Sequence, residues 1–392
     1  MNSSVIGCGA AGTKGLITLL ERGVITKERA HIVNSTMRDV PAEYRDIAII
    51  ISDDERTGGC GKEREAGKQL MRDYIDAGHL DPTSLIHPDD DTCTIIAAPE
   101  GGTGSGASIV LANELNEVLP VHIVMLNGFE DDARGIKNTV NYFKDLNEEF
   151  TVEAISNKKF LTNTGSRSKA ELAANEELVN RMMVYLANPI VESTQNIDAT
   201  DHYKVATTPG FTDIEYVSLD KIKNLESFEK LIDEMVDDTK SVDFTATSKI
   251  IGVYINASEK TADIITNGFG KIKERFGASY ELFHHIQNEG GGEWVAIMAS
   301  GIKLPIEEVE AIYDRYVAES NKVDKTKDSF FGAVSGMKDL DEDSSFNRVA
   351  NRRNKMAGKK EPVQEQNNKP ANKKGFSATV RLVEGDNTVD SY

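Results

Sequence analysis

The stretch Glu100-Gly101-Gly102-Thr103-Gly104-Ser105-Gly106 decides the fold. It follows the apolar run Thr94–Ala98 and opens a helical pattern over Ser105–Val118. Glycines permit positive φ and close backbone approach, so consecutive N–H groups can face a phosphate, and the helix N-terminus adds partial positive charge. The stretch therefore predicts a phosphate-binding loop, and a plain glycine turn is the alternative. No G-x-x-x-x-G-K-[ST] motif occurs in the chain.

Short apolar runs alternate with helical patterns over the first 165 residues. The runs are nearly continuous in aliphatic and β-branched residues, as in parallel strands buried on both faces. They cover Ser4–Ile6, His31–Asn34, Ile47–Ser52, Thr94–Ala98, Val121–Leu126 and Val152–Ile155. The helical patterns cover Gly12–Arg22, Lys62–Asp76, Ser105–Val118 and Ala133–Leu146. This alternation predicts an α/β fold with a doubly wound parallel sheet.

The pattern changes four times further along the chain. A long helical stretch over Ser168–Leu186 has no internal Pro or Gly and predicts a connecting helix. Strands near Ile250–Asn256, Tyr280–His285 and Glu293–Ala299, with helices near Ser227–Val236 and Lys260–Phe276, predict a smaller α/β domain. Pro305–Val323 predicts a further helix. We therefore expect domains at 1–167, 168–203, 204–304 and 305–346, followed by a tail at 347–392 that is basic and disordered.

Composition excludes several classes of protein. The net charge of −19 argues against binding DNA or an anionic membrane through a generally basic surface. Three scattered cysteines argue against a disulfide framework and suit a reducing cytoplasm. No signal-peptide pattern and no run of about 18 apolar residues occurs, so we expect a cytoplasmic protein with no membrane partner.

A second glycine-rich turn lies at the first strand-to-helix junction. It consists of Gly7, Cys8, Gly9, Ala10, Ala11 and Gly12. Taken alone it also fits a Rossmann dinucleotide site, as in a nicotinamide-dependent oxidoreductase. That alternative requires an acidic ribose contact near the end of the second strand, where the chain has Asn34-Ser35-Thr36.

The run Gly-Gly-Thr-Gly-Ser-Gly resembles the signature loop of the tubulin/FtsZ superfamily, which cradles nucleotide phosphates. The resemblance implies that both turns bind the nucleotide, through Gly7, Cys8, Gly9, Ala10, Ala11, Gly12 and through Gly101, Gly102, Thr103, Gly104, Ser105, Gly106. The chain departs from the superfamily pattern at three positions. Lys14 stands where an Asn is usual, Glu100 replaces a glycine or alanine, and Glu171 replaces an aromatic residue. Lys14 is still expected beside the nucleotide.

Two further loops follow in the order of the superfamily. Asp53–Gly59 resembles a tubulin loop, which implies that Asp54 lies near Mg²⁺ and that Gly58 and Gly59 approach the γ-phosphate. An exposed acidic loop is the alternative. In Phe129–Arg134 the resemblance implies that Glu130 contacts the ribose and Arg134 the γ-phosphate, with an i,i+4 ion pair as the alternative.

Two asparagines match the positions that recognise guanine. Asn157 lies in Ile155-Ser156-Asn157-Lys158-Lys159-Phe160, and Asn175 lies in Ala170-Glu171-Leu172-Ala173-Ala174-Asn175. An Asn side chain offers both a donor and an acceptor, which suits the mixed edge of guanine. Because Glu171 replaces the stacking aromatic, the resemblance does not imply base stacking from that position.

The segment Asn196-Ile197-Asp198-Ala199-Thr200-Asp201 matches the loop that this superfamily inserts into the next subunit's nucleotide site. The resemblance implies catalytic roles for Asn196, Asp198 and Asp201, which would orient water toward the γ-phosphate. Taken alone, the two aspartates would be helix-capping acids.

The whole pattern is most similar to the TubZ branch of plasmid- and phage-borne tubulins. It implies a GTPase that polymerises head to tail, uses GTP/GDP and Mg²⁺, and segregates DNA through a DNA-bound adaptor protein. Residues 347–375 carry nine Lys/Arg and two Asp/Glu, a charge of 9 − 2 = +7 that suits such a partner. A division filament of the FtsZ type and a non-polymerising nucleotide-binding regulator remain alternatives.

Overall fold

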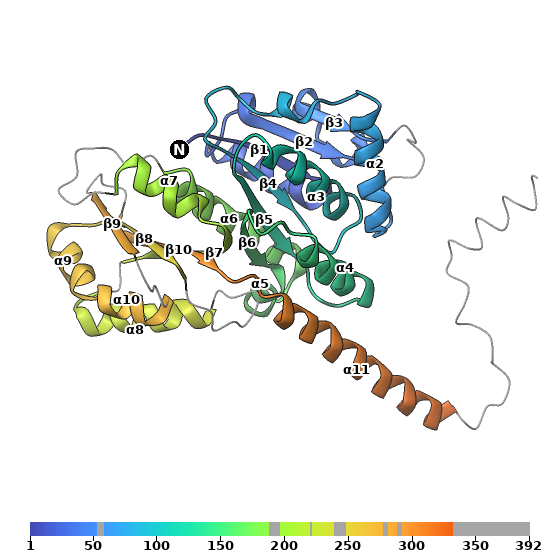
Figure 1. The fold of residues 1–392 in the computed structure, drawn as a ribbon. Helices are drawn as coiled ribbons and strands as arrows, with labels where there is room; N and C mark the ends of the chain where they lie inside the picture. The colour runs from blue at the N-terminus through green and yellow to red at the C-terminus, as the bar shows by residue number, and fades with distance from the viewer. Residues whose placement is uncertain are drawn as a thin grey trace, which may run out of the picture. The chain divides into compact units, whose positions relative to one another are not determined.

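Ten strands form one sheet among the residues that the structure describes. The computed structural model describes residues 1–52, 59–187, 197–219, 222–238, 248–276, 281–287 and 292–331. The strand order is β3-β2-β1-β4-β5-β6-β7-β10-β8-β9 (Figure 1). The strands are β1 Ser3–Cys8, β2 Ala30–Asn34, β3 Ala48–Ile50, β4 Thr92–Ala97, β5 Val121–Asn127, β6 Thr151–Ser156, β7 Gly210–Ser218, β8 Ile250–Asn256, β9 Glu281–Gln287 and β10 Trp294–Ile302.

The first six strands are all parallel, as the apolar runs predict. Every residue of β1, β4, β5 and β6 is buried, because helices cover both faces of this part of the sheet. Neighbouring side chains alternate between two cores: Ile95 faces one core and Ile96 the other. Continuous apolar runs in the sequence reflect this burial on both sides.

The helices divide between the two faces of the sheet. Buried residues of α2, α3 and α4 join one core, and those of α1 and α6 join the other. The helices are α1 Gly9–Glu21, α2 Arg64–Asp76, α3 Thr103–Asn116, α4 Ala133–Lys144, α5 Asn157–Thr164, α6 Arg167–Tyr185, α7 Ala199–Thr207, α8 Leu225–Asp238, α9 Glu259–Asn267, α10 Phe269–Phe276 and α11 Ile306–Phe331. Short 3-10 helices cover Lys27–Arg29, Met37–Asp39, Ala42–Ile47 and Pro82–Leu85.

The sheet continues without a break into the second half of the chain. β7 pairs parallel to β6 and antiparallel to β10, which is also antiparallel to β8. Residues Met1–Lys325 form one compact unit. The predicted domain boundaries after residues 167, 203 and 304 within this unit stay predictions. The tail at 347–392 lies outside the described residues. Among those described, no helix is both long and apolar enough to cross a membrane.

Two features of the second half differ from the sequence prediction. One helix was expected over Lys260–Phe276, but α9 and α10 are separate and meet at Gly268. A Cβ at Gly268 would lie 2.5 Å from the Phe228 ring, so glycine lets α8 pack at this junction. Strand β7 was not predicted, because Asp213 and Glu215 interrupt its apolar pattern although both are buried.

Candidate nucleotide site

A cavity opens where the carboxyl ends of β1, β2 and β4 meet. Its volume is about 300 Å³. The residues that line it come from four chain segments: Cys8, Gly9, Ala10, Ala11, Asn34, Ser35, Asp39, Gly59, Cys60, Gly61, Ala98, Gly101, Gly102, Thr103 and Gly104. Doubly wound sheets bind their ligands at this edge. Most of the residues predicted for the two glycine-rich turns therefore surround one cavity.

Two helices begin at this cavity, and their backbones touch. α1 starts at Gly9 and α3 starts at Thr103. A Cβ at Gly9 would lie 2.7 Å from the Gly104 nitrogen, and a Cβ at Gly104 would lie 2.5 Å from the Cys8 carbonyl oxygen. Gly9 also has φ +69°. Side chains are thus excluded where the two turns meet, and the helix N-termini present N–H groups and partial positive charge suited to an anion.

Ser105 and Gly106, predicted to bind the nucleotide, do not line the cavity in the part of the chain described. Ser105 is fully buried, and its Oγ accepts a hydrogen bond from Arg64 Nε at 3.0 Å. Gly106 faces α2, where a Cβ would clash with the Arg64 carbonyl oxygen. These two residues dock α3 against α2 and so fix the position of its N-terminus.

Gly7 and Gly12 likewise lie behind the cavity lining. A Cβ at Gly7 would lie 2.5 Å from the Gly12 carbonyl oxygen, and one at Gly12 would clash with the Ile96 carbonyl oxygen. The two glycines allow α1 to leave β1 in a tight turn that packs on β4. Their contribution to the site is the shape of this turn.

The sequence analysis missed several lining residues that follow β2. Ser35 Oγ lies 2.9 Å from Thr103 Oγ1, so the loop after β2 is tied to the start of α3. Asn34 is buried, and its Nδ2 has no hydrogen-bond partner among the described residues. Asp39 supplies a carboxylate. The signal in the sequence was their place at the carboxyl end of a predicted strand, where doubly wound sheets bind their ligands.

Glu130 and Arg134 do not form the i,i+4 pair that was the alternative reading. Glu130 pairs with Lys158 at 2.6 Å. Arg134 pairs with Glu63 at 2.8 Å and donates to the carbonyl oxygen of Gly61, a cavity-lining residue, at 3.4 Å. Glu130 has φ +54°, a conformation that non-glycine residues rarely adopt.

Asn157 and Asn175 both lie on helices, α5 and α6. Asn157 begins α5, where its Nδ2 donates to the carbonyl oxygen of Asn127 at 2.9 Å. Its Oδ1 is buried and has no partner among the described residues. Asn175 is buried in α6. A buried acceptor without a donor matches the N–H groups of a guanine edge.

The predicted catalytic loop is described from residue 197 onward. Asp198 is the N-cap of α7, and its Oδ1 accepts from the Asp201 backbone N–H at 2.8 Å. Asp198 is exposed, Asp201 is half-buried, and neither lines the cavity of its own chain. Asn196, Asp54 and Gly58 lie outside the described residues.

Magnesium ligands are few in the part of the chain that the structure describes. No group of three or more His, Cys, Asp or Glu side chains gathers there into a metal site. Asp39 is the carboxylate among the described lining residues. Mg²⁺ is usually held by one or two carboxylates together with phosphate oxygens and waters, so this donor set fits the ion only with a phosphate ligand.

Comparison with known proteins gives relatives by sequence. No family model matches the chain. Tubulin-like protein CetZ of Thermococcus kodakarensis is 27% identical over 238 residues, which cover 57% of this chain and 62% of that protein. CetZ of Pyrococcus horikoshii is 25% identical over 302 residues, 74% of this chain and 79% of that protein. The chain thus spans less than two thirds of the first of these relatives.

Solved structures of the same architecture include both CetZ and TubZ proteins. A GTPγS-bound protofilament of CetZ2 from Haloferax volcanii matches with a TM-score of 0.68 at 20% identity, over 83% of this chain and 100% of that chain. TubZ from Bacillus thuringiensis, in a GTPγS-form protofilament, matches with a TM-score of 0.67 at 14% identity, over 84% and 94% of the two chains. The predicted fold class is confirmed. The chain has the tubulin/FtsZ fold, and the sequence relatives named above are tubulin-like CetZ proteins.

Proposed function

We propose that the protein binds and hydrolyses GTP and assembles head to tail into filaments. The observation that carries this proposal is the cavity in which two helix N-termini meet through the close approach of Gly9 and Gly104. Such a site suits a polyphosphate. Its place in a tubulin/FtsZ-type fold supports a nucleoside triphosphate rather than the dinucleotide of an oxidoreductase.

We assign the remaining groups of the nucleotide to residues that lie outside the lining of the cavity. Glu130 would accept from ribose hydroxyls, and the orphaned Oδ1 of Asn157, together with Asn175, would read guanine. Arg134 would add positive charge, and Lys14, on α1 and paired with Glu171, would lie beside the nucleotide. A Mg²⁺ ion, held by phosphate oxygens with Asp39 or Asp54, would neutralise charge that develops during phosphoryl transfer.

Hydrolysis would be completed by a neighbouring subunit. Asp198 and Asp201 stand on an exposed turn away from the cavity of their own chain. Placed on the cavity of the next subunit, with Asn196, they could orient a water toward the γ-phosphate. A contact of this heterologous kind repeats into an open filament. The protofilament state of the CetZ2 and TubZ structures supports this arrangement.

A mixing experiment tests the shared site. Asp201→Ala should bind GTP but hydrolyse it about 10²- to 10⁴-fold more slowly. Gly101→Asp should fold, because a Cβ at Gly101 meets only the Ala98 carbonyl oxygen, at 3.5 Å, yet its charge should repel phosphate. Each variant alone would be nearly inactive. A mixture would regain activity at interfaces where a GTP-loaded Asp201→Ala subunit meets the intact catalytic loop of a Gly101→Asp subunit.

Three results would count against the proposal. Unchanged turnover by Asp201→Ala would remove the role of the loop. A mixture without activity, while both variants co-assemble, would argue against catalysis between subunits. GTP binding without sedimentable polymer or light scattering would favour the non-polymerising regulator.

Competition between GTP and ATP tests base choice, since equal affinities would contradict guanine reading by Asn157 and Asn175.

We infer that DNA segregation is the cellular role, in a cytoplasm, with a DNA-bound adaptor as partner. The charge of 9 − 2 = +7 over residues 347–375 supports it over a division filament. A basic segment binds DNA phosphates, or an acidic adaptor face, through interactions that salt weakens. Truncation after Ser345 should keep GTP turnover but lose co-pelleting with the adaptor–DNA complex. Unchanged co-pelleting would move the cargo site to the folded body.

A further inference from the structure

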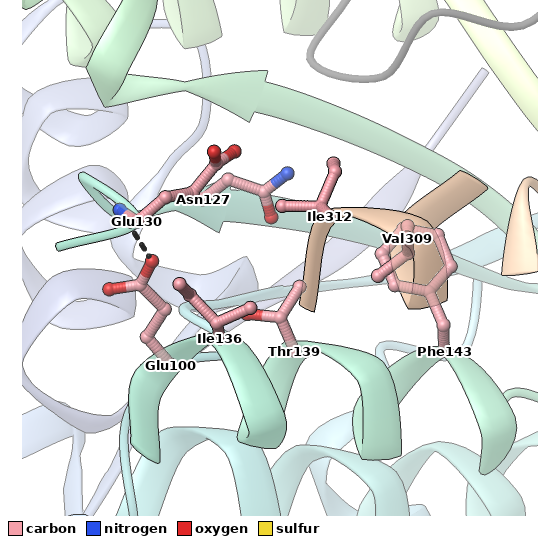
Figure 2. Close-up of a pocket in the computed structure, with 8 residues that line it drawn as sticks. All are labelled: Glu100, Asn127, Glu130, Ile136, Thr139, Phe143, Val309 and Ile312. Carbon is pink, nitrogen blue, oxygen red and sulfur yellow. Dashed lines mark hydrogen bonds between the residues drawn. The ribbon is translucent and has the colours of Figure 1, made fainter. Parts of the chain in front are cut away.

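Glu100 lies in the phosphate loop, but its side chain turns away from the cavity. Its neighbours in sequence, Ala98 and Gly101, line the cavity, whereas its carboxylate reaches the segment that follows β5. Figure 2 shows this carboxylate directed at the backbone of Glu130, with the Glu130 carboxylate pointing away from it. The nucleotide function proposed above gives Glu100 no role.

The contact of Glu100 with this segment is close and specific. Its Oε1 accepts a hydrogen bond from the Glu130 backbone N–H at 3.2 Å. A Cβ at Gly128 would clash with the Glu100 carboxylate, and one at Gly135 would lie 3.2 Å from Glu100 Oε2. Glycines on both sides of Glu130 therefore leave the space in which this carboxylate sits.

The hydrogen bond supports a strained residue. Glu130 has φ +54°, and a non-glycine residue in this region persists only where its surroundings hold it. Lys158 holds the Glu130 side chain at 2.6 Å, and Glu100 holds its backbone. The two contacts together fix the direction in which the Glu130 carboxylate points.

The Glu100 backbone is anchored to the same region. Asn138, buried on α4, donates from Nδ2 to the carbonyl oxygens of Glu100 and Gly101, each at 3.2 Å, and of Lys62 at 3.0 Å. One side chain thus joins the loop before α2 and the phosphate loop to the helix that follows Glu130. A displacement of the phosphate loop would be felt at Glu130 through Glu100.

The apolar surroundings make this contact stronger than an exposed one. A cavity of about 20 Å³ beside Glu100 and Glu130 is lined by Asn127 and Thr139 and by the apolar side chains of Ile136, Phe143, Val309 and Ile312 (Figure 2). The last two belong to the first turns of α11. Poor solvent access strengthens a hydrogen bond to a carboxylate.

We propose that Glu100 is a positioning residue that holds Glu130 in place for the ribose hydroxyls of the nucleotide. This inference rests on the proposed nucleotide function. It links the phosphate and ribose contacts, because the same seven-residue turn that faces the phosphates carries the side chain that supports Glu130. Substituting Glu100 should therefore change selectivity for the sugar although Glu100 touches no part of the ligand.

The test compares GTP with 2′,3′-dideoxy-GTP, which lacks both ribose hydroxyls. The full-length protein should prefer GTP by roughly 10- to 100-fold, the range for hydrogen bonds to a charged acceptor. Glu130→Ala should lose this preference and keep its affinity for the dideoxy nucleotide. Glu100→Ala should lose most of the preference in the same way, and Glu100→Gln should retain it because its amide oxygen still accepts from the Glu130 N–H.

Thermal unfolding of each variant checks that the fold persists, and a general loss of stability would weaken both nucleotides equally. If Glu130→Ala loses the preference and Glu100→Ala keeps it, the inference is overturned while the GTP-binding proposal stands. If the unsubstituted protein binds both nucleotides equally, Glu130 makes no ribose contact and the inference falls with it. Absence of GTP binding by that protein would instead overturn the proposed function itself.

Discussion

Lys14 Nζ lies 3.0 Å from Glu171 Oε2, so two of the three positions that depart from the superfamily pattern contact each other. The pair joins the first helix, α1, to the connecting helix, α6. Both side chains are partly exposed, at 62% and 42%. An ion pair of this exposure stabilises a fold by about 0–1 kcal/mol. The pair therefore adds little stability where the superfamily pattern has an Asn and an aromatic residue.

Restoring the aromatic at position 171 should strengthen nucleotide binding. Stacking by an aromatic ring contributes about 0.5–1.5 kcal/mol, which predicts a roughly 2- to 12-fold tighter complex with GTP for Glu171→Phe. Fluorescence titration with a labelled GTP measures it. Glu171→Leu is the matched control, since it also removes the ion pair but has no ring. Equal affinities of the two variants would show that this position does not face the base.

A buried cluster of charges fixes α6 on the sheet. Arg181 is 3% exposed and donates to Glu177 Oε1 at 2.7 Å and to Glu153 Oε1 at 2.8 Å. Burial alone would lower the pKa of Arg181, but the surrounding carboxylates, which include Asp213 and Glu215 of β7, raise it well above its usual value. The guanidinium therefore stays charged and compensates several acids at once.

We expect Arg181→Met to destabilise the protein strongly. Removing one partner of a buried ion pair leaves uncompensated charge and typically costs about 3–5 kcal/mol. Arg22→Met is the matched control, because Arg22 pairs at the surface with Glu176, which lies on α6 like Arg181, and its loss should change stability little. Urea unfolding measures both. Similar losses in the two variants would contradict the role assigned to the cluster.

The charge of Glu100 should lower the stability of the folded protein at neutral pH. Burial raises the pKa of Glu100 above its usual value of 4.5. Asp131 and Asp132 raise this pKa further, whereas the Glu130 N–H and Lys62 oppose the shift. A pKa raised in the folded state means that stability falls as pH increases from about 4.5 through the folded-state pKa.

Glu100→Gln should therefore melt at a higher temperature than the unsubstituted protein at pH 7. The difference in melting temperature should shrink as pH falls toward 4.5, because the Glu100 carboxyl then becomes protonated in both the folded and the unfolded protein. Glu114→Gln is the control, because it removes a carboxylate from the exposed face of α3. Melting curves across this pH range that run parallel for the unsubstituted protein and the Gln variant would contradict the shift.

The parallel half of the sheet could be predicted because its strands need apolar residues on both faces, which leaves an unmistakable run in the sequence. β7 could not, because Asp213 and Glu215 suggest a surface loop. In the fold both are buried: burial raises the pKa of Glu215 well above its usual value, and Arg181 on α6, about thirty residues away in the sequence, opposes that shift. Whether a strand with acidic residues is buried thus depends on the elements that pack against it in the fold.

The candidate site divides in the same way. The turns at Gly9 and Gly104 were predictable, since glycine and a following helix are local signals. The contact between Lys14 and Glu171, and that between Glu100 and Glu130, join loops that only the folded sheet brings together. In the sequence Lys14, Glu100 and Glu171 each appear as an isolated departure from a pattern. The contact between Lys14 and Glu171 shows that two departures can compensate each other.

Asp198 presents a last problem, because its position fits both a helix cap and a catalytic acid. Its Oδ1 accepts from the Asp201 N–H at 2.8 Å, which is a capping bond that an Asn side chain can also make. Asp198→Asn should therefore keep the stability of the fold, whereas Asp198→Ala should lose about 1 kcal/mol. If the charge orients water in the neighbouring site, both variants should hydrolyse GTP about 10²- to 10⁴-fold more slowly. Steady-state phosphate release at saturating GTP and a fixed polymer mass separates the roles. Full turnover by Asp198→Asn, with a defect confined to the Ala variant, would make Asp198 a cap alone and leave Asp201 as the catalytic acid of this loop.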